Sequence, residues 1–230
     1  MVRDETRLPT AASADLGFET FRSRAAAELL SHSADISRIL AAAENSPARW
    51  HPNSFVVFEL PLVGRWGDLR LHVWPVGDRV VRGWGPIVHR HGWHLASHVL
   101  AGCYSDVLFE DVRTCPEGGT WRRTHAYMVD VPANQPDVIR PVGQVVYVRE
   151  IERRQVPAGS FHYIPAGVFH DTLIPSDVFA ATLVVRSGEG VVSSLVLDDA
   201  EAPVRTYRRP VVSGPQRARV LTQLRDATRA

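Results

Sequence analysis

The feature that most constrains the fold is a change of sequence pattern near residue 54. From there to about residue 198, short runs rich in valine, aromatic residues and threonine are separated by glycine, proline, aspartate or asparagine, as in "SFVVFEL", "LRLHVWPV", "VVYVREIE", "FAATLVVRS" and "VVSSLVL". Many short strands with regular turn signals predict an antiparallel sandwich or barrel. No helical pattern alternates with these runs, which argues against a parallel α/β sheet.

The segments on either side of this region follow other patterns. Between residues 17 and 46, apolar residues recur at helical spacing, and "SHS" at 31–33 is a candidate break between two helices. The helical pattern should end at "ENSP", because the residue before a proline disfavours helix. Beyond the β region, "APVRTYRRPVVSGP" is extended and "QRARVLTQLRDATRA" can form a terminal helix. We therefore divide the chain into an N-terminal helical extension (1–53), a β domain (54–198) and a C-terminal tail with a short helix (199–230).

Composition narrows the class of protein. The 230 residues carry a formal net charge of +1, which gives no reason to expect nucleic acid or an anionic membrane as a partner. Two cysteines are too few for a disulfide framework. No apolar run approaches the roughly 18 residues of a membrane helix, and the first 18 residues lack the apolar segment of a signal peptide. A cytoplasmic protein is the expectation.

Histidines are concentrated in "GWGPIVHRHGWHLASHVLAG", residues 83–102, which holds four of the ten in the chain. On a strand, His89 and His91 would point to the same face with their Cα atoms roughly 6.6 Å apart. Two imidazoles so placed can converge on one ion at about 2.1 Å each. A third ligand must come from elsewhere, and His170 is the candidate, because Pro165 and Gly167 mark a tight turn that returns the chain to the sheet.

The spacing of these residues resembles the first motif of the cupin superfamily. That motif reads G, five residues, H-x-H, three or four residues, E, six residues, G. Here Gly83, His89, His91 and Gly102 stand at the matching intervals, and Leu95 stands where the glutamate should be.

The second cupin motif reads G, five residues, P-x-G, two residues, H, three residues, N. Gly159, Pro165, Gly167 and His170 match it, with Ile174 at the final position. The two motifs in this order cover residues 54–198 approximately. The resemblance implies an all-β fold: a cupin double-stranded β-helix, or jelly-roll barrel, with an N-terminal helical extension.

Leucine at position 95 cannot bind a metal, so the resemblance implies a ligand set of His89, His91 and His170 alone. Such a set is similar to the three-histidine iron sites of thiol dioxygenases and of some ring-cleaving or diketone-cleaving cupins. Three neutral ligands leave a divalent ion with about +2 charge, which favours an anionic co-ligand and leaves positions for substrate and O2. The resemblance therefore implies a non-haem Fe(II) dioxygenase acting on a small polar or anionic molecule.

A fainter similarity links the chain to the cysteine dioxygenase branch, through the helical N-terminus and "DLRLHVWPVGDRV". That branch carries a Ser-x-His-x-Tyr run after its last ligand. This chain has "ATLVVRSG" in the comparable region. Cysteine itself is therefore not expected as the substrate.

Other functions remain compatible with the same residues. A lyase, isomerase or hydrolase using Zn, Mn or Ni could use the three-histidine cage without redox chemistry. A cupin that binds a small molecule without catalysis is a further alternative, although no segment resembles a DNA-binding domain. A helix or tail that crosses to a neighbour would be compatible with a homodimer.

Several further side chains are candidates for contact with substrate or ligands. One of His162 and Tyr163 should face inward and could orient a ligand histidine, while Tyr147 could contact substrate or pack in the core. Arg65, Arg70 and Arg149 could each bind a substrate carboxylate, although each alone is more often a surface residue.

Other residues near the motif are not expected to bind a metal or a substrate. His94 should lie in a solvated turn, and His98 should point away from the Leu95 face, which Ser97 shares. Cys103 and Tyr104 are adjacent on a strand and therefore face opposite ways, so no crosslink between them is expected.

Overall fold

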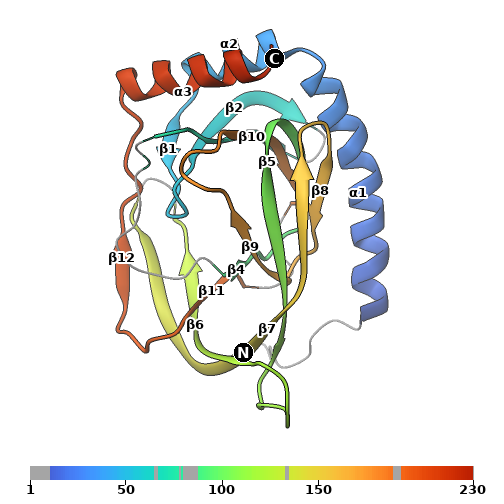
Figure 1. The fold of residues 1–230 in the computed structure, drawn as a ribbon, viewed down its shortest axis with the longest axis vertical. Coiled ribbons are helices and arrows are strands. Elements are labelled where there is room, and N and C mark those ends of the chain that lie inside the picture. Colours follow the sequence, from blue (N-terminus) through green and yellow to red (C-terminus); the bar gives the residue numbers. More distant parts are fainter. Residues whose placement is uncertain are drawn as a thin grey trace, which may run out of the picture.

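The computed structural model describes residues 11–64, 67–77, 79, 88–132, 135–188 and 193–229, without the side chains of 11–16, 63–64 and 67–68. Strands dominate, and helices lie at both ends of the chain (Figure 1). The elements are α1 (Ala11–Ser33), α2 (Ile36–Asn45), β1 (Ala48–Trp50), β2 (Val56–Gly64), β3 (Gly67–Trp74), β4 (His89–Arg90), β5 (Leu95–Val112), β6 (Arg122–Asp130), β7 (Asp137–Pro157), β8 (Phe161–Ile164), β9 (Phe169–Leu173), β10 (Ala180–Arg186), β11 (Leu195–Asp198), β12 (Arg205–Tyr207) and α3 (Gly214–Ala227).

The helices confirm the pattern seen in the sequence. The chain turns between α1 and α2 directly after Ser33, and Asp35 caps the start of α2, because its carboxylate accepts a hydrogen bond from the Arg38 amide at 2.9 Å. Phe21, Ala25 and Leu29 form one buried stripe on α1 at the four-residue spacing of a helix face. This stripe joins buried residues of α2, α3 and strands β1, β2, β3 and β10 in a single apolar core.

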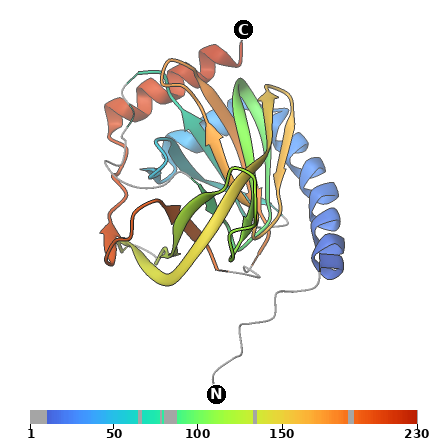
Figure 2. The ribbon, with the colours of Figure 1, turned by 60° about the horizontal axis from the view of Figure 1, so that its bottom comes forward.

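The strands pair in antiparallel fashion throughout. The pairing order runs β1–β2–β3–β10–β5–β9–β4–β11–β6–β7–β12, and β8 joins β5. Because β5 also pairs with β7, the strands β5, β9, β4, β11, β6 and β7 close into a ring. Figures 1 and 2 show the long strands β5 and β7 running through the whole molecule, with α1 along one side. The expected antiparallel β architecture is therefore present.

Alternation along the strands separates a core face from an inner face. The β3 residues in the helix-covered core are Leu69, Leu71 and Val73. The opposite face of β3 therefore carries Arg70, His72 and Trp74.

The neighbouring strands repeat this division. On β5, Ala96 belongs to the helix-covered core, so Leu95 and Ser97 share the inner face. Ser97 is paired with His162 of β8, and both are buried. Polar side chains thus gather on the side of the sheet away from the helices.

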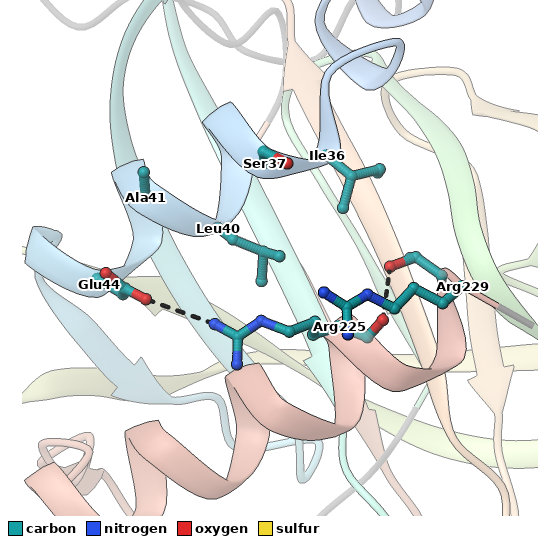
Figure 3. Close-up of a pocket in the computed structure, with 8 residues that line it drawn as sticks. Ile36, Ser37, Leu40, Ala41, Glu44, Arg225 and Arg229 are labelled. Atoms are coloured by element: carbon teal, nitrogen blue, oxygen red, sulfur yellow. Dashed lines mark hydrogen bonds and ion pairs between the residues drawn. The ribbon is translucent and has the colours of Figure 1, made fainter.

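Helices α2 and α3 lie side by side (Figure 1). Arg217 of α3 donates hydrogen bonds to the carbonyls of Ala43, Glu44 and Ser46 at the end of α2, at 2.7–3.1 Å. Figure 3 shows the shallow groove of about 300 Å³ between the two helices, with Arg225 paired to Glu44 at its edge. No described helix has the length and apolar character needed to cross a membrane.

Candidate metal centre

Three histidines predicted from separate motifs meet in the structure. His89 lies in β4 and is the register partner of His170 in β9, while His91 follows β4 directly. The ring centroids lie 4.3 Å apart for His89 and His170, 4.8 Å for His89 and His91, and 5.1 Å for His91 and His170. One ring nitrogen from each lies within 4.8 Å of the others. The cluster can therefore present three nitrogen ligands to one point.

The local chain around His170 fixes the direction of its ring. Phe169 enters an apolar cluster, so the next side chain, His170, points to the opposite face. Its Nδ1 lies 3.1 Å from the Val168 carbonyl oxygen, which can only accept, so Nδ1 donates and Nε2 is left as the lone-pair nitrogen. The Gly167 amide donates to the His91 carbonyl at 2.8 Å and joins the turn before His170 to the segment that carries His91.

The cluster is electrostatically suited to neutral imidazoles. Burial lowers the pKa of His91 and of His170 well below the ordinary value, and nearby histidines lower both further. Neutral imidazole is the form that binds a metal.

The dimensions of the cluster fit one ion. Two nitrogens bound to one ion at about 2.1 Å can lie at most about 4.2 Å apart. The three ring nitrogens lie within 4.8 Å of one another, so small ring rotations would bring them to metal-binding distances.

Two further histidines beside the cluster could not be found from the motifs. His51 lies in a tight turn in which its amide donates to the Phe55 carbonyl at 2.7 Å and the Ser54 amide donates to the His51 carbonyl at 2.9 Å. Ser54 has a φ of 67°, a conformation uncommon outside glycine and often found at functional sites. The Asn53 amide donates to Nδ1 of His51 at 3.2 Å, which leaves the ring proton on Nε2.

His72 of β3 is the second of these histidines. Phe55 contacts both rings, with its centroid 4.2 Å from His51 and 4.9 Å from His72. Burial lowers the pKa of His51, and Arg209, His89 and His72 lower it further. His51 and His72 therefore form a wall beside the three-histidine cluster. From the sequence, the only indications that these two histidines belong to the site are that His51 lies in a turn and that His72 lies on the inner face of a strand.

Positive charge surrounds the cluster. Arg186 lies over the Trp93 ring at 5.1 Å, and Trp93 stacks on His91 at 5.1 Å. Arg70 lies on the inner face of β3, and both arginines lower the pKa of His91. These two guanidinium groups could attract an anionic ligand toward the histidines.

The remaining arginine candidates lie elsewhere. Arg149 pairs with Glu110 at the surface and lies over the Trp121 ring, which agrees with the surface position expected for a single arginine of this kind. Arg65 is outside the described residues, as is Gly83 of the first motif.

The candidate catalytic side chains occupy three different environments. His162 is the inward residue of its strand, but its ring contacts Tyr104 and Asp106. Tyr163 packs against the helix-covered core beneath Arg22, which removes it from the cluster. Tyr147 lies between the buried residues Val146 and Val148 and is therefore on the opposite face of β7 from their apolar cluster. Of the three, His162 lowers the pKa of the ligand His170, which places it within electrostatic range of the cluster.

His94 and His98 are the two histidines of residues 83–102 that are not part of the three-histidine cluster. The expected solvated position of His94 is wrong, since its ring packs against Phe18 and Phe21 of α1 and its Nδ1 accepts from the Ala166 amide at 2.9 Å. His98 points away from Leu95 as expected and stacks on Phe161 at 4.6 Å. Neither ring joins the three-histidine cluster.

The low pKa of His72 predicts a pH dependence of stability. Burial, followed by the charges of Arg70 and Arg209, lowers the pKa of His72 from 6.5 to about 3. Between these values the unfolded chain binds a proton that the folded chain does not, so the free energy of unfolding should fall as the pH drops from 6.5 toward 3, by up to about 1.4 kcal/mol per pH unit. Urea unfolding with a chelator present, at pH 7, 6 and 5, should show a shallower fall for His72→Gln. Equal slopes would contradict the assignment.

Comparison with known proteins adds no family assignment. No protein-family model matches the sequence, and no curated protein matches it. The site is therefore defined by its own geometry: three imidazoles from two separated segments meet inside a β-rich fold.

Proposed function

We propose that the chain is a metal-dependent cupin enzyme, a non-haem Fe(II) dioxygenase that acts on a small polar or anionic substrate and O2. The observation that carries the proposal is the convergence of His89, His91 and His170 on one point. Iron, zinc, copper and nickel all accept imidazole ligands, so the proposal for iron rests on the resemblance to three-histidine oxygenases.

The cupin assignment is supported by the backbone at the motif glycines. Gly102, Gly159 and Gly167 all have a positive φ, between 77° and 84°, where a side chain is disfavoured. The antiparallel ring of strands agrees with a barrel. The motif positions therefore have a physical reason in this fold, beyond their spacing.

The ligand set and its surroundings support an anionic substrate. The structure provides no carboxylate to the cluster among its described residues, so a bound divalent ion would keep its full charge. Arg70 and Arg186 add positive charge, and His51 presents an Nε2–H donor on the same wall. A carboxylate, enolate or thiolate would be stabilised in such a site.

When bound, iron would act as a Lewis acid and template and would supply the chemistry of O2 activation. The chain's own contribution is to hold three neutral imidazoles in place, with His170 locked by its hydrogen bond to Val168. His51, His72 and Phe55 would shape the substrate cavity beside them.

The test is anaerobic loading of the protein with Fe(II), Zn(II), Mn(II) or Ni(II), followed by O2 uptake measurements with a panel of small thiols, carboxylates and enolisable diketones. O2 consumption that requires both Fe(II) and one class of anionic substrate is the expected result. Turnover of a substrate without O2 in the Zn, Mn or Ni form would instead establish the lyase, isomerase or hydrolase alternative. Tight binding without turnover in every form would establish a binding protein.

A further inference from the structure

A chain of buried polar side chains lies on the inner face of the sheet, outside the three-histidine cluster. The Tyr104 hydroxyl lies 2.8 Å from Nδ1 of His162, and Nε2 of His162 lies 2.9 Å from Oδ2 of Asp106, although its N–H is aimed to one side of that oxygen. Arg154 reaches the same carboxylate oxygen at 3.2 Å. Tyr104 and His162 are each 3% exposed and Asp106 is fully buried, so solvent does not mediate these contacts.

The partners fix where the protons are. A carboxylate only accepts, so the His162 nitrogen facing Asp106 carries the ring proton. The other nitrogen, Nδ1, then accepts from the Tyr104 hydroxyl. Burial raises the pKa of Tyr104 above its ordinary value, and Asp106 raises it further, so the phenol keeps its proton at rest. The arrangement has the order of a triad: a hydroxyl, an imidazole base and a carboxylate that orients the base.

This order suits removal of one electron from the phenol. An oxidised phenol is a strong acid, so its proton must leave with the electron. Nδ1 of His162 is a base already in hydrogen-bond contact with that proton. Asp106 would stabilise the imidazolium that forms, and Arg154 contacts the same carboxylate at 3.2 Å.

An aromatic path connects this set to the three-histidine cluster. The Trp74 ring stacks on Tyr104 with the centroids 6.2 Å apart, and its centroid lies 4.5 Å from that of Phe55 and 6.2 Å from that of His72. His72 lowers the pKa of the ligand His91, which places it within electrostatic range of the cluster. Trp74 thus contacts both Tyr104 and the His72 side of the cluster.

We propose that Tyr104 is a redox-active tyrosine with His162 as its proton acceptor and Trp74 as its electron relay. A one-electron oxidant takes an electron from Trp74, and Tyr104 then donates an electron to the oxidised Trp74. The phenolic O–H bond breaks as its proton moves to Nδ1 of His162. The products are a neutral Tyr104 radical, a His162 imidazolium paired with Asp106, and the reduced oxidant. Reduction of the radical returns the proton to the phenol. Within the protein the one-electron oxidant would come from O2 activation at a redox-active metal held by His89, His91 and His170, and this last point alone rests on the proposed function.

The test uses an external oxidant, so its outcome does not depend on the proposed function. Full-length protein with redox-inert Zn(II) is oxidised by photogenerated Ru(III) tris-bipyridine and frozen for electron paramagnetic resonance. We expect a tyrosyl radical signal that forms more slowly in D2O, because the proton moves with the electron. The signal should be lost in Tyr104→Phe and kept in the matched control Tyr147→Phe, which alters the β7 tyrosine whose register partners are Val112 and Arg123.

The variant His162→Gln separates redox function from a merely structural hydrogen bond. Its amide can still accept from Tyr104 and donate toward Asp106, but it cannot take up a proton, so the radical signal should be lost while the melting temperature changes little. Asp106→Asn serves if His162→Gln does not fold, and it should lower the radical yield by removing the compensating charge. An unchanged signal in Tyr104→Phe, or a wild-type yield in either His162→Gln or Asp106→Asn, would overturn the proposal.

Discussion

Replacing His170 with alanine should abolish metal binding, while wild-type protein purified anaerobically with Fe(II) should hold close to one ion per chain. The ring supplies one of three converging nitrogens, and the rest of the site offers no described carboxylate to replace it. Loss of an outer partner of a ligand already costs about 10–100-fold in metal affinity, so loss of a ligand itself should cost more than about 100-fold. Metal quantitation after gel filtration measures the difference.

The matched control is His98→Ala, which also removes the ring of a half-buried histidine from the β-sheet. His98 stacks on Phe161 and points away from the Leu95 face, so the ion content should be unchanged. Equal metal content in the His170 and His98 variants would contradict the site, provided that circular dichroism shows both to be folded.

Replacing Gly102 with alanine should destabilise the fold by about 2–5 kcal/mol, from the left-handed conformation and from overpacking together. Gly102 has a φ of 77°, and an added Cβ would overlap the Phe179 carbonyl oxygen and lie 2.9 Å from the Ala180 Cα. These are backbone atoms of β10 and its approach, so they cannot rotate away. The free energy of unfolding from urea titration measures the effect.

Gly159→Ala is the control that isolates the steric part. Gly159 has almost the same φ, 80°, but an added Cβ would meet nothing within 4 Å. Its cost should be only the conformational part, about 1–2 kcal/mol. If both variants lost the same free energy, the close approach of β5 to Phe179 would not be the reason for a glycine at position 102.

The strands were predictable because short β-type runs and turn residues carry local information. A break between two N-terminal helices was also predictable from the local pattern, although it lies at residues 34–35, directly after the predicted 31–33, and the terminal helix at Gly214–Ala227 was predictable in the same way. The ring closure by β5 and β7 was not predictable, because pairing between distant strands depends on packing that local pattern does not encode. Strands β5 and β7, with 18 and 21 residues, are also longer than the short runs from which the strands were predicted.

The three histidines of the cluster were predictable from spacing, since strand alternation and a turn before His170 aim them inward. His51 and His72 were missed because each stands alone in its segment. Their importance comes only from the fold, which brings a turn near residue 51 and the inner face of β3 beside the cluster. The choice between His162 and Tyr163 was likewise left open, because both are aromatic and only the pairing of His162 with the buried Ser97 decides it.

The most direct test of the central claim is a crystal of the protein grown with Fe(II), measured at the iron absorption edge. The account predicts one anomalous peak about 2.1 Å from a nitrogen of each of His89, His91 and His170. A structure in which the iron peak lies elsewhere, or in which these three rings turn away from a common point despite saturating metal, would contradict it.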